Sequence, residues 1–207
     1  VDNATVFVLD MTSQRYLTKK EVNRPEWRHW VTIVKPARVK HSTGLLYIGG
    51  GGNDDKVPSA PTELMAIARA TQSVVAEIRM VPNQPLVFVG EKRTRSEDAI
   101  IAYSWDKFLK TGEEKWPLRL PMTKAAVRAL DTVTDFMATQ KGGDVKVDRF
   151  VVTGASKRGW TTWSTAAVDQ RVVEIIPNVI DMLNTEASFK HHRDAYGGYA
   201  EAVHDYT

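Results

Sequence analysis

Short apolar runs rich in β-branched residues alternate along this chain with longer helical segments, and this alternation constrains the fold most. The runs TGLLYI (43–48), SVVAEIRMV (73–81) and RFVVTG (149–154) are each followed by helical patterns, and VVEIIPNVI (172–180) follows the last of them. Strands separated in this way must run parallel, because a parallel connection needs a long crossover. The alternation predicts an α/β domain, with a mostly parallel sheet covered by helices on both faces.

The first 40 residues have a different pattern. ATVFVLD (4–10) and HWVTIVKP (29–36) are joined by a proline-containing connection without a helix, which predicts two antiparallel strands at the start of the sheet. No repeat or flexible linker follows, so we expect residues 1–207 to form a single domain. The polar, aromatic segment 182–207 is expected to be a cap or lid over a site, or the start of a truncated element.

Two helix starts have recognisable signals. Pro61 fits the first turn of a helix that carries Leu64, Ile67 and Ala68 on one face, because its missing N–H has no intrahelical partner there. Thr94 and Glu97 have the spacing of a capping box, which predicts that a helix begins after Thr94.

The composition excludes several classes of protein. Basic residues number 28 against 25 acidic ones, a net charge of +3 without a basic arm, so nothing favours nucleic-acid binding. The chain has no cysteine, which excludes disulfides and thiolate metal sites. No apolar run approaches the ~20 residues of a membrane span. We expect no cofactor and no metal.

The stretch VVTGASKRGW places a serine at a strand-to-helix junction. A serine hydroxyl becomes a nucleophile when a sharp turn exposes it above a helix N-terminus and a base accepts its proton. Gly154 lies two residues before Ser156, as in the G-x-S-x-G motif of hydrolases, but Gly159 comes one residue late. The motif is therefore partly met, and a purely architectural glycine turn is the alternative.

The stretch YIGGGGND provides a second partial motif. A glycine cluster after the third strand of a hydrolase sheet lets backbone N–H groups point at a developing oxyanion, and Gly50, Gly51 and Gly52 lie in that place. Nucleotide sites are disfavoured, because Trp160-Thr161 replaces the Lys-Ser/Thr of a phosphate loop and the glycine cluster lacks the third glycine of a dinucleotide fingerprint. A mobile turn without function is the alternative for the four glycines.

Several separated stretches together resemble one family. LDMTSQRYLTKKEVNRPEWRHWVTIVKP, LLYIGGGGN, VVTGASKRGWTTW, IIPNVIDMLN and HHRDAYGGY look like the PhoPQ-activated pathogenicity-related protein family, which includes autocrine proliferation repressor proteins. The resemblance implies an α/β-hydrolase fold. It implies that residues 1–207 are the N-terminal part of a longer chain. It also implies an exported protein, secreted or periplasmic.

The resemblance implies roles for the serine, the two cations after it and the glycine loop. Ser156 is expected to be the nucleophile, with the backbone N–H of Lys157 joining the Gly50 to Gly52 loop in the oxyanion hole. The form G-x-S-[KR]-x-G is also similar to glucuronoyl esterases, so Lys157 or Arg158 is expected to favour an anionic substrate. A solvated helix start is the alternative for both cations.

The acid and the histidine of a triad are less well defined. Asp181 follows a predicted strand and is the candidate acid, with a helix cap as the alternative. His191, His192 and His204 lie in the polar tail, where their spacing fits no known helix-based pair of metal ligands and indicates surface histidines. His29 is expected to be a packed structural residue.

These features together predict a serine hydrolase that acts on a small-molecule or polymeric ester or amide. Two alternatives remain: an exported binding or signalling protein without turnover, and a structural subunit in which the serine turn is only architectural. The oligomeric state is not determined by the sequence.

Overall fold

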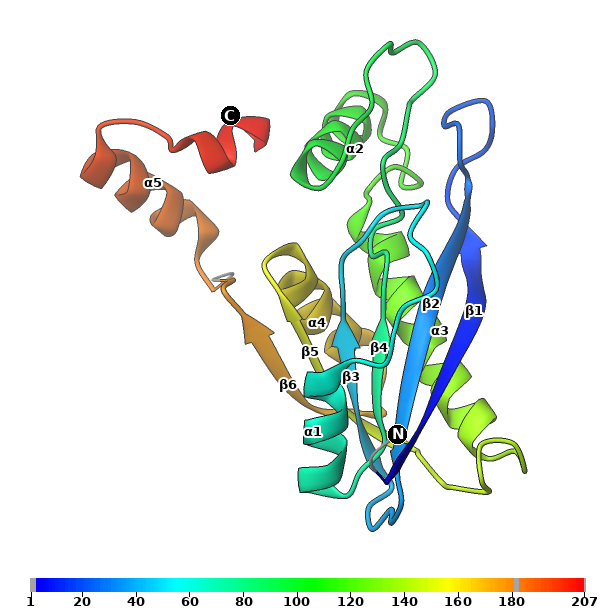
Figure 1. Ribbon diagram of the computed structural model, residues 1–207. Helices are drawn as coiled ribbons and strands as arrows, with labels where there is room; N and C mark the ends of the chain where they lie inside the picture. The colour runs from blue at the N-terminus through cyan, green and yellow to red at the C-terminus, as the bar shows by residue number, and fades with distance from the viewer. Residues whose placement is uncertain (1–2, 181–182, 207) are drawn as a thin grey trace.

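A computed structural model describes residues 3–180 and 183–206 of the chain (Figure 1). Its centre is a six-stranded sheet in the order β1-β2-β4-β3-β5-β6. The strands are β1 (Ala4–Arg15), β2 (Glu26–Pro36), β3 (Thr43–Ile48), β4 (Val75–Ile78), β5 (Arg149–Ala155) and β6 (Val172–Asn178).

Strand directions follow the pattern of the connections. β1 and β2 pair antiparallel, as do β2 and β4, whereas β4, β3, β5 and β6 are parallel neighbours. Among the described strands, β2 alone therefore runs against the other five. The mostly parallel α/β sheet and its antiparallel start are confirmed, and the arrangement is α/β-hydrolase-like.

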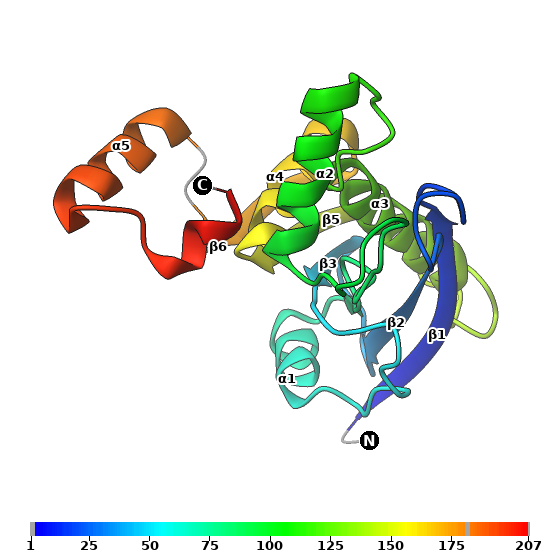
Figure 2. The ribbon, with the colours of Figure 1, turned by 90° about the horizontal axis from the view of Figure 1, so that it is seen from above.

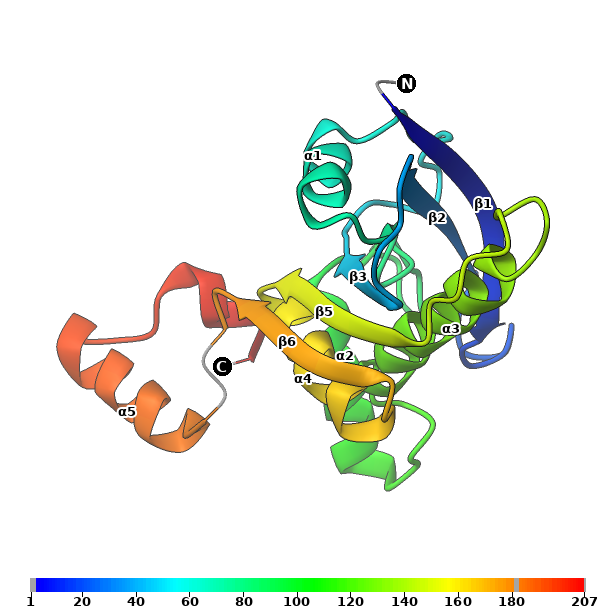
Figure 3. The same ribbon diagram turned by 90° about the horizontal axis from the view of Figure 1, so that it is seen from below.

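Helices cover both faces of this sheet, which Figures 2 and 3 show from opposite sides. α1 (Thr62–Thr71) packs on one face, where Val34 and Val75 meet Leu64, Met65 and Ala68. The other face carries α2 (Asp98–Thr111), α3 (Arg119–Met137) and α4 (Lys157–Val168) over the larger core.

Alternation along β4 explains the two cores. Val75 points to the α1 side, while Val74, Ala76 and Ile78 point into the larger core, because successive side chains of a strand face opposite sides of the sheet. All four side chains are buried, as expected for a parallel strand covered on both faces.

Two local predictions were wrong. Leu64 and Ala68 of α1 are buried as predicted, but Ile67 is 38% exposed and Met65 is buried in its place. The Thr94–Glu97 capping box does not form: Glu97 itself precedes α2 and makes no capping hydrogen bond, because its carboxylate is engaged by distant side chains.

The tail forms α5 (Thr185–Tyr196) and the 3₁₀ helix η1 (Glu201–Tyr206). α5 lies to one side of the sheet in Figure 1 and buries none of its described residues, whereas η1 lies beside α2. A lid function for 182–207 stays a prediction. None of the described helices has the length and apolar character needed to cross a membrane.

Candidate active site around Ser156

Ser156 occupies a strained turn between β5 and α4. Its backbone has φ 54° and ψ −123°, a conformation that residues with a Cβ rarely adopt. The turn is held on both sides, because the Ser156 N–H donates to the Asn178 carbonyl at 2.9 Å and the Ser156 carbonyl accepts from the Trp160 N–H at 3.0 Å. The residue is exposed, and its hydroxyl has no hydrogen-bond partner among residues 3–180 and 183–206.

The flanking glycines allow α4 to start this close to the sheet. A Cβ on Gly154 would lie 2.7 Å from the Arg158 carbonyl oxygen. A Cβ on Gly159 would lie 2.9 Å from the Asn178 carbonyl oxygen and 3.0 Å from that of Gly154. The glycine that comes one residue late thus packs the first turn of α4 against both β5 and β6.

The glycine loop begins beside the serine turn. The pairing of β3 with β5 ends with Ile48 opposite Gly154, so the glycine loop and the serine turn both leave the sheet at its carboxyl edge, where Gly50 packs against Arg158. The carbonyls of Gly49 and Gly50 accept from the N–H groups of Val81 and Met80, at 3.2 and 2.8 Å. The N–H groups of Gly50, Gly51 and Gly52 have no partner in the part of the chain described, nor does that of Lys157.

Both cations after Ser156 turn towards acidic side chains. Lys157 Nζ lies 2.7 Å from Glu97 Oε2 and 3.0 Å from Asp98 Oδ2, and 11% of its side chain is exposed. Arg158 donates to Glu97 Oε1 at 2.8 Å and to the Val81 carbonyl at 2.6 Å. Both charges are therefore paired within the protein. The sequence had instead suggested that one of them would be available to an anionic substrate.

Glu97 is ionised in spite of its partial burial. Burial is the largest single influence and raises the pKa of its carboxyl. Contacts with Lys157, Gln84 and Arg158 together outweigh it and bring the pKa to about 2. The carboxylate therefore holds a full charge against the two cations at physiological pH.

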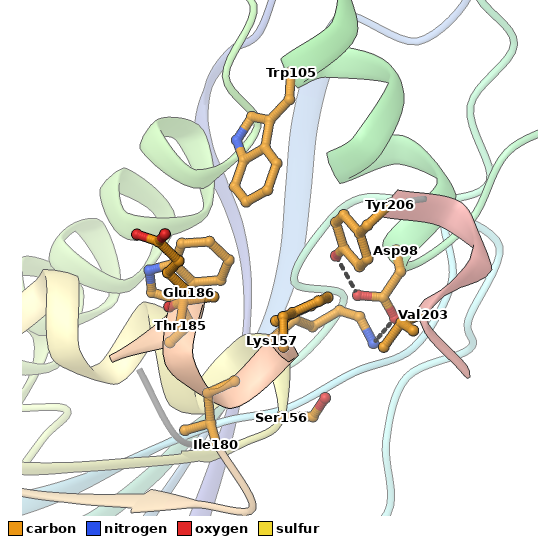
Figure 4. A pocket seen from close by; sticks show the side chains of 11 residues that line it. Asp98, Trp105, Ser156, Lys157, Ile180, Thr185, Glu186, Val203 and Tyr206 are labelled. Carbon is orange, nitrogen blue, oxygen red and sulfur yellow. Dashed lines mark hydrogen bonds and ion pairs between the residues drawn. The ribbon is translucent and has the colours of Figure 1, made fainter. Parts of the chain in front are cut away.

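A pocket of about 490 Å³ opens beside Ser156 (Figure 4). The start of α4 and one side of α2 form part of its wall, and the tail closes another part. Tyr206 donates its hydroxyl to Asp98 at 2.7 Å, and burial and this contact raise the pKa of Tyr206. The lining residues are Asp98, Trp105, Ser156, Lys157, Trp160, Ile180, Thr185, Glu186, Phe189, Val203 and Tyr206.

The structure brings together only some of the predicted site residues. Ser156 and Lys157 share the pocket, the Gly50 to Gly52 loop lies at the same sheet edge, and Arg158 points to Glu97 instead of the pocket. Asp181 lies outside the described residues.

The histidines of the tail do not line the pocket. His192 accepts from the Ala200 N–H at 3.1 Å and contacts the rings of Tyr196 and Tyr199, while His191 and His204 are also in the tail. No group of side chains that could hold a metal ion occurs among the described residues.

His29 is buried, as expected, and pairs with a serine. Its Nδ1 lies 2.9 Å from the Arg79 carbonyl, which can only accept, so Nδ1 carries the proton. Nε2 then accepts from the Ser13 hydroxyl at 2.9 Å. Burial lowers the pKa of His29 to about 4, and the backbone contacts oppose this less strongly.

Sequence reasoning missed the residues that surround Ser156 from other elements. Glu97 and Asp98 balance Lys157 and Arg158, and Trp105 lines the pocket. One signal was available: two cations at a helix N-terminus are unfavourable unless acidic groups lie near, and Glu97-Asp98 is an acidic pair at a predicted helix start.

Comparisons with known proteins agree with the family resemblance. The family model of the PhoPQ-activated pathogenicity-related protein matches residues 1–207. Autocrine proliferation repressor protein A of Dictyostelium discoideum is 40% identical over 206 residues, which are 98% of this chain and 41% of that protein. This chain therefore spans less than half the length of that relative.

Solved structures similar to this chain include two esterases. Acetyl xylan esterase 1 of Thermoanaerobacterium sp. JW/SL YS485 is 13% identical, with a TM-score of 0.45 over 97% of this chain and 65% of that one. Brefeldin A esterase, described as a bacterial homologue of human hormone sensitive lipase, is 13% identical, with a TM-score of 0.41 over 83% and 37%. On the match to the family model and to the Dictyostelium relative, the chain belongs to the PhoPQ-activated pathogenicity-related protein family.

Proposed function

We propose that this protein is a serine hydrolase that cleaves an ester or amide bond with Ser156 as its nucleophile. The observation that carries the proposal is the Ser156 turn. It combines an exposed hydroxyl that has no partner among the residues the structure describes, a strained backbone and a position at the start of α4. Strain of this kind persists only where the surrounding structure holds it, and it concentrates at functional sites.

In the proposed reaction, the Ser156 Oγ attacks the substrate carbonyl while a general base accepts its proton. The carbonyl oxygen becomes an oxyanion as the C–O bond to Ser156 forms. The N–H of Lys157 and those of the Gly50 to Gly52 loop are the proposed donors to this oxyanion, since all of them lack partners within the described residues. The leaving group then departs with a proton, and water releases the acyl group.

The pocket favours an apolar group on the substrate. Its walls carry the aromatic rings of Trp105, Trp160, Phe189 and Tyr206. Lys157, the lysine among its described lining residues, is neutralised by Glu97 and Asp98, so these lining residues offer no free cation to offset an anionic group. We therefore propose an uncharged apolar substituent next to the scissile bond, in place of the anionic substrate expected from sequence.

A binding protein without turnover is the second candidate. It is favoured by the absence of a hydrogen-bonded base on Ser156 Oγ within the described residues. Such a protein would use the same pocket but would leave the serine unreactive.

Phosphonate labelling distinguishes the two candidates. The whole protein is incubated with a fluorophosphonate bearing an alkyl chain, and digested peptides are mapped by mass spectrometry. The hydrolase proposal predicts one adduct, on Ser156, and none on the Ser156→Ala variant. The absence of an adduct, where a control serine hydrolase is fully labelled, would rule out the hydrolase in favour of the binding protein.

A further inference from the structure

We propose that Gln84 and Glu97 form a strut that fixes the glycine loop against the serine turn. Both are positioning residues, because they touch the backbone and side chains around the site and neither Gln84 nor Glu97 lines the pocket. The effect of the strut on reaction at Ser156 rests on the proposed function. Its effect on the position of the glycine loop can be tested even if the protein is not a hydrolase.

Gln84 holds the glycine loop at two points. Gln84 is buried, with 8% of the residue exposed, and its Nε2 donates to the Gly51 carbonyl at 3.1 Å. Its backbone carbonyl accepts from the Asn53 N–H at 2.5 Å. One residue thus bonds both the middle and the end of the loop.

These contacts set the direction of the loop's N–H groups. In a planar trans peptide, the N–H of one residue points opposite to the carbonyl of the residue before it. The Gly49, Gly50 and Gly51 carbonyls accept from Val81, Met80 and Gln84, so the N–H groups of Gly50, Gly51 and Gly52 point away from the 80–84 segment. β3 lies between β4 and β5, so for Gly50 this direction is towards the Ser156 side of the sheet.

Glu97 connects Gln84 to the serine turn. The two residues bond twice, since Gln84 Nε2 donates to Glu97 Oε1 at 2.5 Å and the Glu97 N–H donates to Gln84 Oε1 at 2.7 Å. The same carboxylate binds Arg158 at 2.8 Å and Lys157 at 2.7 Å, the two residues that directly follow Ser156. A continuous path therefore runs from Gly51 through Gln84 and Glu97 to the first turn of α4.

The strut also fixes how closely its two ends approach. Gly50 packs against Arg158, where an added Cβ would lie 2.9 Å from Nη2. Glu97 has φ 53° and ψ −127°, close to the values of Ser156. Both Glu97 and Ser156 are therefore held in a rarely adopted backbone conformation. Loss of the strut would release the loop and the turn relative to each other.

Small displacements at such a site are costly. Removal of one oxyanion donor lowers kcat by about 10²–10³-fold, and a misplacement of about 1 Å costs about 10²-fold. A loosened loop that still visits the right geometry should lose less than a deleted donor. We therefore expect losing the strut to slow reaction at Ser156 by about 10- to 100-fold, without weakening binding in the pocket.

The test compares two neighbouring buried amides in the whole protein. Gln84→Met keeps the shape of the side chain and removes its hydrogen bonds to the loop and to Glu97. Asn83→Leu is the matched control, because Asn83 is 3% exposed and also makes three hydrogen bonds, to Arg28 and Met80, but none to the glycine loop. The inactivation rate at saturating fluorophosphonate (kinact) and the half-saturating concentration (KI) are measured for both.

The strut predicts that Gln84→Met lowers kinact by about 10- to 100-fold with KI changed by less than about twofold. Asn83→Leu should lower the melting temperature while kinact stays within about twofold of wild type. Equal kinact values in the two variants, or a change confined to KI, would overturn the proposal. Should Gln84→Met fail to fold, Glu97→Gln replaces it, with Glu91→Gln as its control because Glu91 pairs with Arg95 away from the site.

Hydrogen–deuterium exchange separates this proposal from the proposed function. If the wild-type protein is not labelled at all, the hydrolase proposal fails. The rate of amide exchange in residues 49–53 then still tests whether the strut holds the glycine loop. The strut predicts faster exchange there in Gln84→Met than in Asn83→Leu, and equal rates in the two variants would refute it.

Discussion

Two serines of this protein have opposite surroundings. Ser13 lies in β1 and donates to His29 Nε2, the contact that activates a catalytic serine, yet both residues are buried. Ser156 has no histidine at its hydroxyl among the described residues, but it is exposed in a strained turn beside a pocket. A serine–histidine contact alone does not identify a nucleophile. Access for a substrate and donors for an oxyanion are needed as well.

The difference follows from how each region is built. The β1–β2 hairpin packs its side chains against α3 and the larger core, so the Ser13–His29 pair satisfies two polar groups that are both buried. The β5–α4 junction instead ends at the sheet edge, where Gly154 and Gly159 let the helix start abruptly. The first arrangement stabilises the fold, and the second exposes a hydroxyl.

The largest expected effect separates the two serines by reactivity. Ser156→Ala should lower fluorophosphonate labelling by more than about 10³-fold, because it removes the only group proposed to attack the probe. Ser13→Ala should leave the labelling rate within about twofold of wild type. Loss of labelling in Ser13→Ala, with a folded protein by circular dichroism, would transfer the reactive role to the buried pair.

The pH dependence of stability distinguishes the two regions next. His29 has a folded pKa of about 4 against about 6.5 when unfolded, so the unfolded chain binds more protons between these values. Stability should therefore fall as the pH is lowered from about 6.5 to about 4, by up to ~3 kcal/mol from this group. Denaturant titrations at several pH values measure the slope, and His29→Gln should lack most of it.

The ion pairs of Glu97 make stability depend on pH in a second range, which lies below that of His29. The folded pKa of Glu97 is about 2, below its unfolded value of 4.5, so its contribution is present above about pH 4.5 and is lost as the pH falls towards 2. Glu97→Gln should flatten the stability curve in this window while preserving the His29 slope. Flattening of the upper window instead would show that the two regions are coupled.

The tight packing of the serine turn gives a somewhat smaller expected effect. Gly159→Ala places a Cβ against backbone oxygens of Asn178 and Gly154, which should cost about 1–3 kcal/mol of stability and slow labelling at Ser156. Gly198→Ala is the control, since no atom of the described residues lies within 4 Å of its added Cβ, and should change stability by less than about 0.5 kcal/mol. Equal costs in thermal unfolding would contradict the packing role of Gly159.

The smallest expected effect belongs to the buried pair. Ser13→Ala leaves the His29 Nε2 without a donor and should cost about 1 kcal/mol of unfolding free energy. Ser13→Thr keeps a hydroxyl and serves as the comparison in chemical denaturation. A stability unchanged by Ser13→Ala would show that the contact contributes nothing measurable.

Features local in sequence were predictable, and those built from distant segments were not. The alternation of strands and helices identified the parallel sheet, and Gly154 with Ser156 identified the turn. The capping box failed because Glu97 is held by Lys157 and Arg158, about 60 residues away, whose charges outweigh a local hydrogen bond. Gln84 carries no sequence signal for its role, which depends on the fold placing Gly51 and Glu97 on either side of it.

Trapping an acyl-enzyme tests the central claim most directly. The whole protein is mixed with p-nitrophenyl butyrate, an uncharged apolar ester, quenched in acid within the first turnover, and mapped by mass spectrometry. Our account predicts a burst of p-nitrophenol of about one equivalent and a butyryl group on the peptide that contains Ser156. Ester turnover with the acyl group on another residue, or none of these signals with the wild-type protein, would contradict it.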